Sequence, residues 1–402
     1  MKSSKGILVI SYFFPPLLGS QAIQAGRMLR FLPELGWQVH VLAGGIAPPY
    51  RSDTTLLEFL PGEVTVQRIK TINLDPFFFF LPFLRFLPDP QVGWLWPARK
   101  GASRIPFQPD VILSLSSPFT GHLAALSISR NLSLPWAAAF SDPWTNSPYV
   151  PNSPVSKVIS SSWERKVLSQ ADLLIFPADS LRDFVLSGYP PEWNRKSVVI
   201  PHSFDPAETG AEERTPPPPP PWVITCAQNF YGPRTPIPLI HLMESFYRTR
   251  SPGASEIRVQ LIGRLEEKYR VMIQEAFPGG EMAYLGEVEH GRAVELLRKS
   301  HAILLTDPPF SVSAPFFPAK IPECLAMARP IFGLTPPEGT AGNILRRHGA
   351  CVVSPEDETK VGVFEKFLLQ VQEGGAPVPH FPEELHSRAV GRLLSSTLET
   401  LL

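Results

Sequence analysis

The chain has 402 residues, 44% of them hydrophobic, and its 37 basic side chains balance its 37 acidic ones. This length and composition predict a globular protein of two domains, and the zero net charge argues against a nucleic-acid-binding surface. Three widely spaced cysteines indicate neither a disulfide framework nor a zinc site. We find no signal peptide and no apolar run of the roughly 18 residues that a membrane span needs, and we expect a cytoplasmic protein.

The first predicted unit is a strand, a tight turn and a helix. Residues 6–12 form a short apolar, β-branched run, which is typical of a strand buried in a parallel sheet, and Pro15-Pro16 ends it. Gly19 and Ser20 then precede a helical pattern over residues 21–32. Two interpretations of this glycine and serine stay open: they present a helix amino terminus to an anion, or they only turn the chain and cap the helix.

A segment rich in aromatic residues follows between residues 74 and 88. It contains four consecutive phenylalanines, Phe77, Phe78, Phe79 and Phe80, together with the basic residue Arg85. This composition suits the headgroup region of a membrane, so we predict a peripheral membrane or acceptor contact here. The alternative is a loop that packs onto its own domain.

The rest of the chain alternates predicted strands with predicted helices in two series. In the first series, strands are predicted at 37–43, 111–115, 136–140, 173–176 and 198–200, and helices at 120–130 and 160–170. In the second, strands are predicted at 222–226, 257–262, 282–285, 302–305 and 330–333, and helices at 238–248, 266–276, 291–299 and 322–327. This alternation predicts an α/β fold of two Rossmann-like, doubly wound parallel-sheet domains that face each other across a cleft.

Six prolines at 216–221 mark the predicted domain boundary. A polyproline stretch forms a semi-rigid spacer rather than part of a packed core. We therefore predict an N-terminal domain at 1–205, a linker at 206–221, a C-terminal domain at 222–380 and a final helical segment at 381–402.

Six segments occur in an order that is typical of one enzyme family. They are Phe13-Phe-Pro-Pro-Leu-Leu-Gly19, Asp110-Val-Ile-Leu-Ser, Leu134 to Trp144, Ala171-Asp-Leu-Leu-Ile, Val199 to Asp205 and Ala319 to Ile331. In this order and spacing, the chain resembles the family 4 glycosyltransferases over about residues 5–370. The resemblance implies the two-domain GT-B fold and transfer of a sugar from a nucleotide donor with retention of configuration. It also implies no metal or other cofactor, an acceptor on the first domain, the donor on the second, and a last helix that crosses back, although local packing explains that helix equally well.

The resemblance also implies donor-binding residues in the second domain. Glu323 would accept hydrogen bonds from the ribose hydroxyls, and Lys320 would face the donor. A departing diphosphate requires positive charge, for which Arg234 is the first candidate and Arg264 the second. The alternatives are a helix-dipole role for the glutamate and plain surface roles for the cations. The family usually has a further glutamate where this chain has Pro315, which leaves the sugar and even the activity in question.

The first domain contributes four further candidates, two for donor binding and two for the acceptor side. Gly19 and Ser20 would face the diphosphate or the sugar, because a residue without side-chain bulk permits close approach. Asp142 and His122 are the catalytic candidates. The alternative for the aspartate is a turn residue before a proline, and for the histidine capping or packing is favoured over catalysis. We name no protein nucleophile.

Three function classes follow. The leading one is a glycosyltransferase of cell-surface polysaccharide or glycolipid synthesis, which uses a nucleotide sugar and a glycan or lipid-linked acceptor at the inner face of the cytoplasmic membrane. The second is a sugar-nucleotide epimerase of the same fold. The third is a non-catalytic member that binds a nucleotide sugar or a glycan. None of the three involves nucleic acid.

Overall fold

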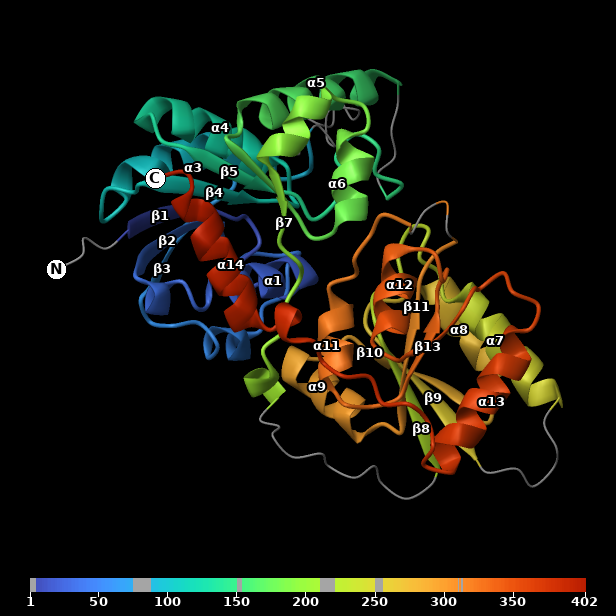
Figure 1. The fold of residues 1–402 in the computed structure, drawn as a ribbon. Coiled ribbons are helices and arrows are strands. Elements are labelled where there is room, and N and C mark those ends of the chain that lie inside the picture. The colour runs from blue at the N-terminus through green and yellow to red at the C-terminus, as the bar shows by residue number, and fades with distance from the viewer. Residues whose placement is uncertain are drawn as a thin grey trace. The chain divides into compact units, whose positions relative to one another are not determined.

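The computed structural model of the protein describes residues 5–74, 88–149, 154–209, 221–249, 256–309, 311 and 314–402. These residues form two compact units (Figure 1): unit 1 comprises residues 1–205 and 384–402, and unit 2 comprises residues 206–383. The predicted membrane or acceptor contact at Phe77, Phe78, Phe79 and Phe80 lies outside the described residues. Most of the predicted linker also lies outside them, because residues 210–220 are not described.

Unit 1 is built on a parallel sheet of seven strands in the order β3-β2-β1-β4-β5-β6-β7. The order reverses between β1 and β4, which both pair with parallel neighbours. Open sheets of this kind bind ligands beyond the carboxyl ends of the strands at such a reversal. The strands are β1 (Lys5–Ile10), β2 (Trp37–Gly44), β3 (Val64–Ile69), β4 (Val111–Leu115), β5 (Trp136–Ala139), β6 (Leu173–Phe176) and β7 (Ser197–Val199).

Helices cover both faces of this sheet. Successive strand residues point to opposite faces: Ile7 and Val9 of β1 pack with α1 and α14, whereas Leu8 and Ile10 pack in the core that contains residues of α3, α4, α5 and α6. The α-helices are α1 (Ser20–Leu29), α3 (Leu95–Gly101), α4 (Thr120–Leu132), α5 (Pro154–Gln170), α6 (Asp179–Leu186) and α14 (Ser387–Glu399). The 3₁₀ helices are η1 (Pro33–Leu35), η2 (Thr54–Leu57), η4 (Val92–Trp94), η5 (Ala102–Arg104), η6 (Pro191–Lys196) and η8 (Glu383–Leu385).

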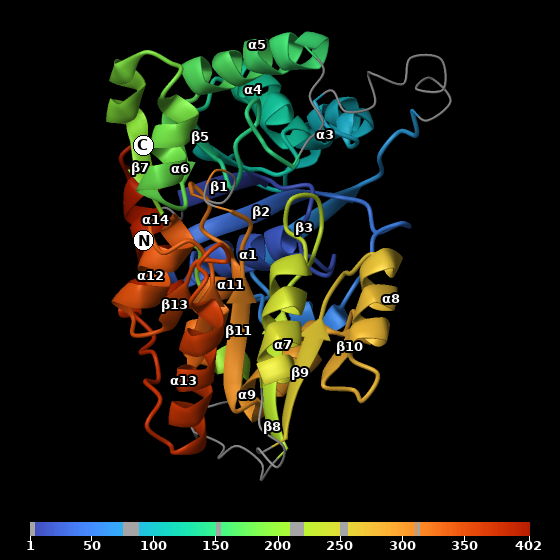
Figure 2. The ribbon, with the colours of Figure 1, turned by 90° about the vertical axis from the view of Figure 1, so that its right-hand side faces the viewer.

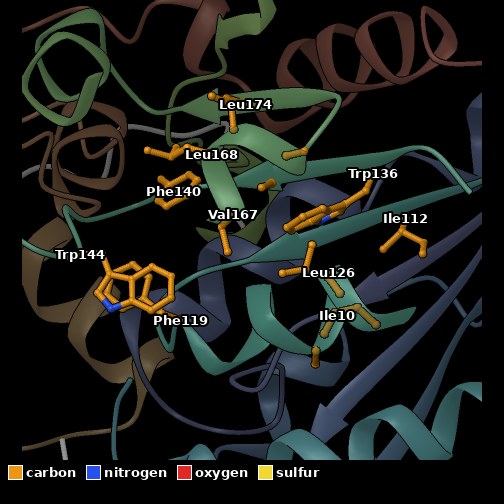
Figure 3. Close-up of a cluster of buried hydrophobic side chains, with 14 of the residues drawn as sticks. Ile10, Ile112, Phe119, Leu126, Trp136, Phe140, Trp144, Val167, Leu168 and Leu174 are labelled. Carbon is orange, nitrogen blue, oxygen red and sulfur yellow. The ribbon is translucent and has the colours of Figure 1, made fainter. Parts of the chain in front are cut away.

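Aromatic side chains fill much of the second of these cores (Figure 3). Trp136 of β5 is buried, and its Nε1 donates to Ser114 Oγ of β4 at 2.8 Å. Trp144, after β5, stacks on Phe119, after β4, with ring centroids 4.6 Å apart and planes 5° apart. The stack ties the loops after these two neighbouring strands to each other.

The carboxyl-terminal helix α14 belongs to unit 1. It packs on α1 through Val390 and Leu394. Trp37 Nε1 of β2 donates to Ser395 Oγ at 2.9 Å, and Lys5 Nζ donates to Glu399. The chain therefore completes unit 1 with residues that follow unit 2 in sequence.

Unit 2 repeats the same topology with six parallel strands, in the order β10-β9-β8-β11-β12-β13. The order reverses between β8 and β11. The strands are β8 (Trp222–Ala227), β9 (Ile257–Ile262), β10 (Met282–Gly286), β11 (Ala302–Thr306), β12 (Ile331–Leu334) and β13 (Cys351–Val353).

Within unit 2, one face of the sheet carries α7, α8 and α13, and the other carries α9, α11 and α12 (Figures 1 and 2). The helices are η7 (Pro206–Thr209), α7 (Ile237–Thr249), α8 (Glu267–Ala276), α9 (His290–Lys299), α11 (Lys320–Ala326), α12 (Thr340–Arg347) and α13 (Lys360–Gln372). Each unit thus has two helical layers around one parallel sheet, and the predicted class, α/β with two Rossmann-like domains, is confirmed. In the part of the chain that the structure describes, we find no helix both long and apolar enough to span a membrane.

Candidate functional site

The strand reversal of unit 2 carries a largely buried ion pair. Arg234, in the loop after β8, places Nη2 3.2 Å from Oδ1 of Asp307, the residue directly after β11. Oδ2 of the same aspartate accepts a hydrogen bond from Thr335 Oγ1, directly after β12, at 3.2 Å. The arginine side chain is 17% exposed and the aspartate 7%. Burial raises the pKa of Asp307, and the neighbouring guanidinium only partly opposes this rise.

A glutamine fixes the base of the same loop. Gln228 Nε2, just after β8, donates to Thr306 Oγ1 at 2.7 Å and to Thr306 O at 3.1 Å, and its Oε1 accepts from Thr306 N at 3.0 Å. These bonds lock the carboxyl ends of β8 and β11 together. The loop that carries Arg234 therefore starts from a rigid position.

The loop after β9 completes this edge of unit 2. Gly263 has φ +119°, and a Cβ there would lie 2.3 Å from Gln228 O, so only glycine fits this close approach. The backbone of Arg264 is held on both sides: its N–H donates to Asn229 Oδ1, and its carbonyl accepts from Phe230 N, both at 2.8 Å. The Arg264 side chain is exposed, so this second candidate has a fixed backbone and a solvated charge.

The structure brings Lys320 and Glu323 of α11 together. Glu323 Oε1 accepts from Lys320 Nζ at 2.7 Å, and Oε2 lies 3.7 Å from His290 Nε2 of α9. The glutamate side chain is only 1% exposed, whereas the lysine is 29% exposed. The lysine fills one acceptor position of Oε1, and it is the more exposed partner of the pair.

Pro315 lies buried in the segment before α11. The adjacent Ala314 carbonyl accepts from Thr340 N at 3.0 Å and from Thr340 Oγ1 at 2.7 Å, which ties the segment to the start of α12. A proline side chain has no polar atom. This position therefore cannot bind sugar hydroxyls in the way a glutamate would.

In unit 1, a half-buried arginine holds the turn after β1. Arg68 of β3 donates through Nη2 to Phe14 O at 3.2 Å and to Pro15 O, and through Nη1 to Gly44 O at 3.2 Å. Burial lowers the pKa of Arg68 to about 10. The sequence did not point to this residue, because its role depends on β2 and β3 lying beside the turn.

The glycine and serine of this turn lie at the start of α1. The helix begins at Ser20, which is exposed, and Gly19 is its N-cap without a side-chain capping bond. A Cβ at Gly19 would meet no atom within 4 Å. Packing therefore does not explain this glycine, and the predicted role of both residues toward the donor stays a prediction.

Asp142 lies in the loop after β5, where two bonding networks fix it. Its Oδ2 accepts from Ser117 Oγ, in the loop after β4, at 3.1 Å. The backbone N–H groups of Trp144 and Thr145 donate to Oε1 of the buried Glu164 at 3.3 and 3.4 Å. Oε2 of this glutamate accepts from Tyr189 Oη at 2.8 Å, and burial raises the pKa of the tyrosine. Sequence reasoning missed Glu164, since nothing in α5 marks it as buried.

His122 is completely buried in the core of unit 1. Its Nδ1 lies 2.7 Å from Ser114 Oγ, and its ring centroid lies 4.5 Å from that of Phe140. Burial lowers the pKa of His122 to about 3, so the imidazole is neutral. These contacts favour the packing role over a role at a substrate, and a catalytic role stays a prediction.

A small cavity lies at the carboxyl ends of β4 to β7 in unit 1. Its polar lining includes Gln21, Ser141 and His202, and burial together with the charge of Arg27 lowers the pKa of His202 to about 4. The cavity volume is about 30 Å³, which is room for about two water molecules and not for a sugar ring. In the described ranges, we find no group of three or more His, Cys, Asp or Glu side chains placed to hold a metal ion. The expected independence of metal stays a prediction.

Comparisons with known proteins agree with this architecture. Residues 21–208 match the model of Glycosyltransferase Family 4. Sucrose-phosphate synthase from Thermosynechococcus elongatus is similar at a TM-score of 0.67 and 12% identity, with 99% of each chain covered. Anabaena Alr3699/HepE in complex with UDP-glucose is similar at a TM-score of 0.64 and 14% identity, with 99% of this chain and 100% of that chain covered. A putative UDP-N-acetylglucosamine 2-epimerase from Listeria monocytogenes is similar at a TM-score of 0.56 and 12% identity, with 100% and 97% covered.

The search of curated proteins gave no match. At such low identity the similar structures establish the fold alone, and that fold is the GT-B fold of glycosyltransferases. Residues 21–208 thus match the Glycosyltransferase Family 4 model within a chain that has the GT-B fold, and the resemblance predicted from the sequence is confirmed.

Proposed function

We propose that this protein transfers a sugar from a nucleotide-sugar donor to a glycan or lipid-linked acceptor with retention of configuration. The observation that carries the proposal is the Arg234–Asp307–Thr335 constellation at the strand reversal of unit 2. It presents a guanidinium with a fixed partner at the place where open parallel sheets bind nucleotides. A fixed positive charge there stabilises the negative charge that develops on a departing diphosphate.

Lys320 and Glu323 supply a second step of donor recognition. When the lysine turns from Glu323 Oε1 toward the phosphates, it brings another positive charge to the leaving group. The same movement leaves Oε1 able to accept from the ribose hydroxyls, and a carboxylate binds vicinal hydroxyls well. The starting contact, 2.7 Å between Lys320 Nζ and Glu323 Oε1, supports this exchange of partners.

We assign the acceptor to unit 1, where Asp142 would bind one of its hydroxyls, and we keep Gly19 and Ser20 as donor contacts. The hydrogen bond from Ser117 and the Glu164 bonds to the same loop hold the aspartate in place, as a binding residue requires. The similar Anabaena protein was solved with UDP and with UDP-glucose, which supports a uridine nucleotide sugar as the first donor to test.

An acceptor-dependence assay tests the proposal. Labelled UDP-, GDP- and ADP-sugars are incubated with the protein, with and without a panel of glycan and polyprenyl-linked acceptors. A transferase consumes donor beyond slow hydrolysis only when an acceptor is present. Epimerised donor without any acceptor would replace the proposal with the epimerase alternative, which the similar Listeria fold motivates. Donor binding without turnover would support the non-catalytic alternative.

A further inference from the structure

We propose that His290 is a positioning residue that holds the Glu323 carboxylate for recognition of the donor ribose. The inference rests on the proposed function and adds a residue outside the motifs that led to it. It starts from a buried array in unit 2: His290 Nε2 lies 3.7 Å from Glu323 Oε2 and 3.8 Å from Glu208 Oε2. The three side chains are 4%, 1% and 3% exposed, in the order His290, Glu323 and Glu208.

Burial of the Glu323 carboxylate costs free energy, and only hydrogen-bond donors or positive charges beside it offset that cost. A buried carboxylate loses its hydration, and it persists only where hydrogen bonds or charges replace the lost water. Glu323 has Lys320 on Oε1 and His290 near Oε2. When Lys320 leaves Oε1 for the phosphates, the imidazole still lies beside Oε2, so the carboxylate keeps its place and direction.

The histidine is itself held independently of α11. It is the first residue of α9, whose Val294 and Leu297 are buried, and α9 packs on β8 and η7. Glu208 lies on η7 (Pro206–Thr209), so the ring nitrogen lies between carboxylates from two different segments. Because α9 has its own packing on β8 and η7, His290 can keep Glu323 in place while the Lys320 side chain moves.

Ribose discrimination gives a readout that a merely structural residue would not change. We first identify which of UDP, GDP and ADP binds the full-length wild-type protein most tightly by calorimetry, and then measure the 2′-deoxy form of that nucleotide. Wild type should bind the ribonucleotide roughly tenfold more tightly, as expected for one hydrogen bond to a charged group. His290→Gln should reduce that ratio to about twofold, and Glu323→Gln should abolish it.

The double variant sharpens the test. If His290 acts through Glu323, adding His290→Gln to Glu323→Gln should change the ratio no further, because residues that act as one unit are not additive. His241→Gln, on the exposed histidine of α7, is the matched control and should keep the wild-type ratio. Thermal unfolding of each variant shows whether it is folded. Glu208→Gln is a second variant of the array and should lower the ratio of ribonucleotide to 2′-deoxynucleotide affinity by about threefold.

Two outcomes overturn the proposal in distinguishable ways. If wild type binds none of the three nucleotides, the proposed function fails and this inference fails with it. If wild type prefers the ribonucleotide and His290→Gln keeps the full preference, the proposed function stands and only the positioning role is overturned.

Discussion

The two sheets reverse their strand order in the same way but carry different chemistry at that point. In unit 2 the strands next to the reversal are followed by charged or hydroxyl residues: Asp307 after β11 and Thr335 after β12. In unit 1 the strands in the corresponding places are followed by Ser116 after β4 and by the buried Phe140 after β5. The same topology therefore carries a carboxylate paired with the Arg234 guanidinium at one reversal, and a serine and a buried aromatic ring at the other.

The difference comes from a few residues at the strand ends, not from the sheets themselves. Both sheets have buried apolar strands, as parallel sheets require. The histidine near the unit 1 reversal, His122, is neutral inside the core, whereas Arg234 near the unit 2 reversal keeps an ionic partner. This difference supports the proposed assignment of the diphosphate to unit 2 and the acceptor to unit 1, and the following variants test that assignment or the burial on which the contrast depends.

Removal of the guanidinium should have the largest effect. Arg234→Ala deletes the charge proposed to stabilise the leaving diphosphate and should lower kcat about 100-fold or more, which corresponds to about 2.7 kcal/mol or more. Steady-state kinetics with the identified donor measure the change. Arg258→Ala, at an exposed arginine of β9, is the control, and equal kcat values for the two variants would contradict the assignment to unit 2.

The carboxylate of α11 should contribute less. Glu323→Gln keeps the shape of the side chain but removes its charge, so the affinity for the nucleotide should fall by about 1 to 3 kcal/mol. Calorimetry measures this change in nucleotide affinity. The exposed Glu295 of α9, paired with Arg292 and Lys299, offers a matched Glu→Gln control with unchanged affinity. An unaltered Kd for Glu323→Gln would remove the ribose role.

The neutral histidine of unit 1 predicts a pH effect on stability. The folded-state pKa of His122 is about 3, below the unfolded value of about 6.5. As the pH falls from 6.5 toward 3, only the unfolded state takes up this proton, and stability is lost by up to about 1.4 kcal/mol per pH unit. His122→Gln should therefore show a shallower loss of stability than wild type in denaturant titrations between pH 6.5 and 4. Parallel curves for the two proteins would show that this histidine does not titrate as its burial requires.

The smallest effect concerns the acceptor loop. Tyr189→Phe removes the hydroxyl that donates to Glu164 and should cost about 1 kcal/mol of stability. The variant should also raise the KM for the acceptor and leave the KM for the donor unchanged. Tyr247→Phe, which removes a comparable bond to Ile257 O in unit 2, is the control. Equal changes in the KM for the acceptor and the KM for the donor in Tyr189→Phe would contradict a role of this loop in acceptor binding.

Strands with continuous apolar runs could be predicted closely from the sequence. The predicted limits of β4, β6 and β9 agree with the structure; β4 and β6 are buried along their whole length, and strands buried on both faces leave an unambiguous signal. The strand β3 was not predicted, since it lies at the sheet edge and its middle residues are only half buried. The helix α5 begins at Pro154, six residues before the predicted start at residue 160, because proline is tolerated in the first turn.

Residues of the candidate site could be predicted only where a sequence motif includes them. Arg234, Lys320 and Glu323 follow from the family resemblance, and the structure gives each of them a polar partner. Asp307, Glu164 and His290 were missed, although all three are buried and engaged. Their roles arise from contacts between segments that lie far apart in the chain, and a single sequence does not show such contacts.

The most direct test of the central assignment compares nucleoside diphosphates with monophosphates. Calorimetry on wild type and Arg234→Ala should be run with UDP, GDP and ADP and with the three corresponding monophosphates. We predict that wild type binds at least one diphosphate roughly tenfold more tightly than its monophosphate, and that Arg234→Ala loses this preference. An arginine variant that keeps the full preference, or a wild type that prefers no diphosphate, would contradict it.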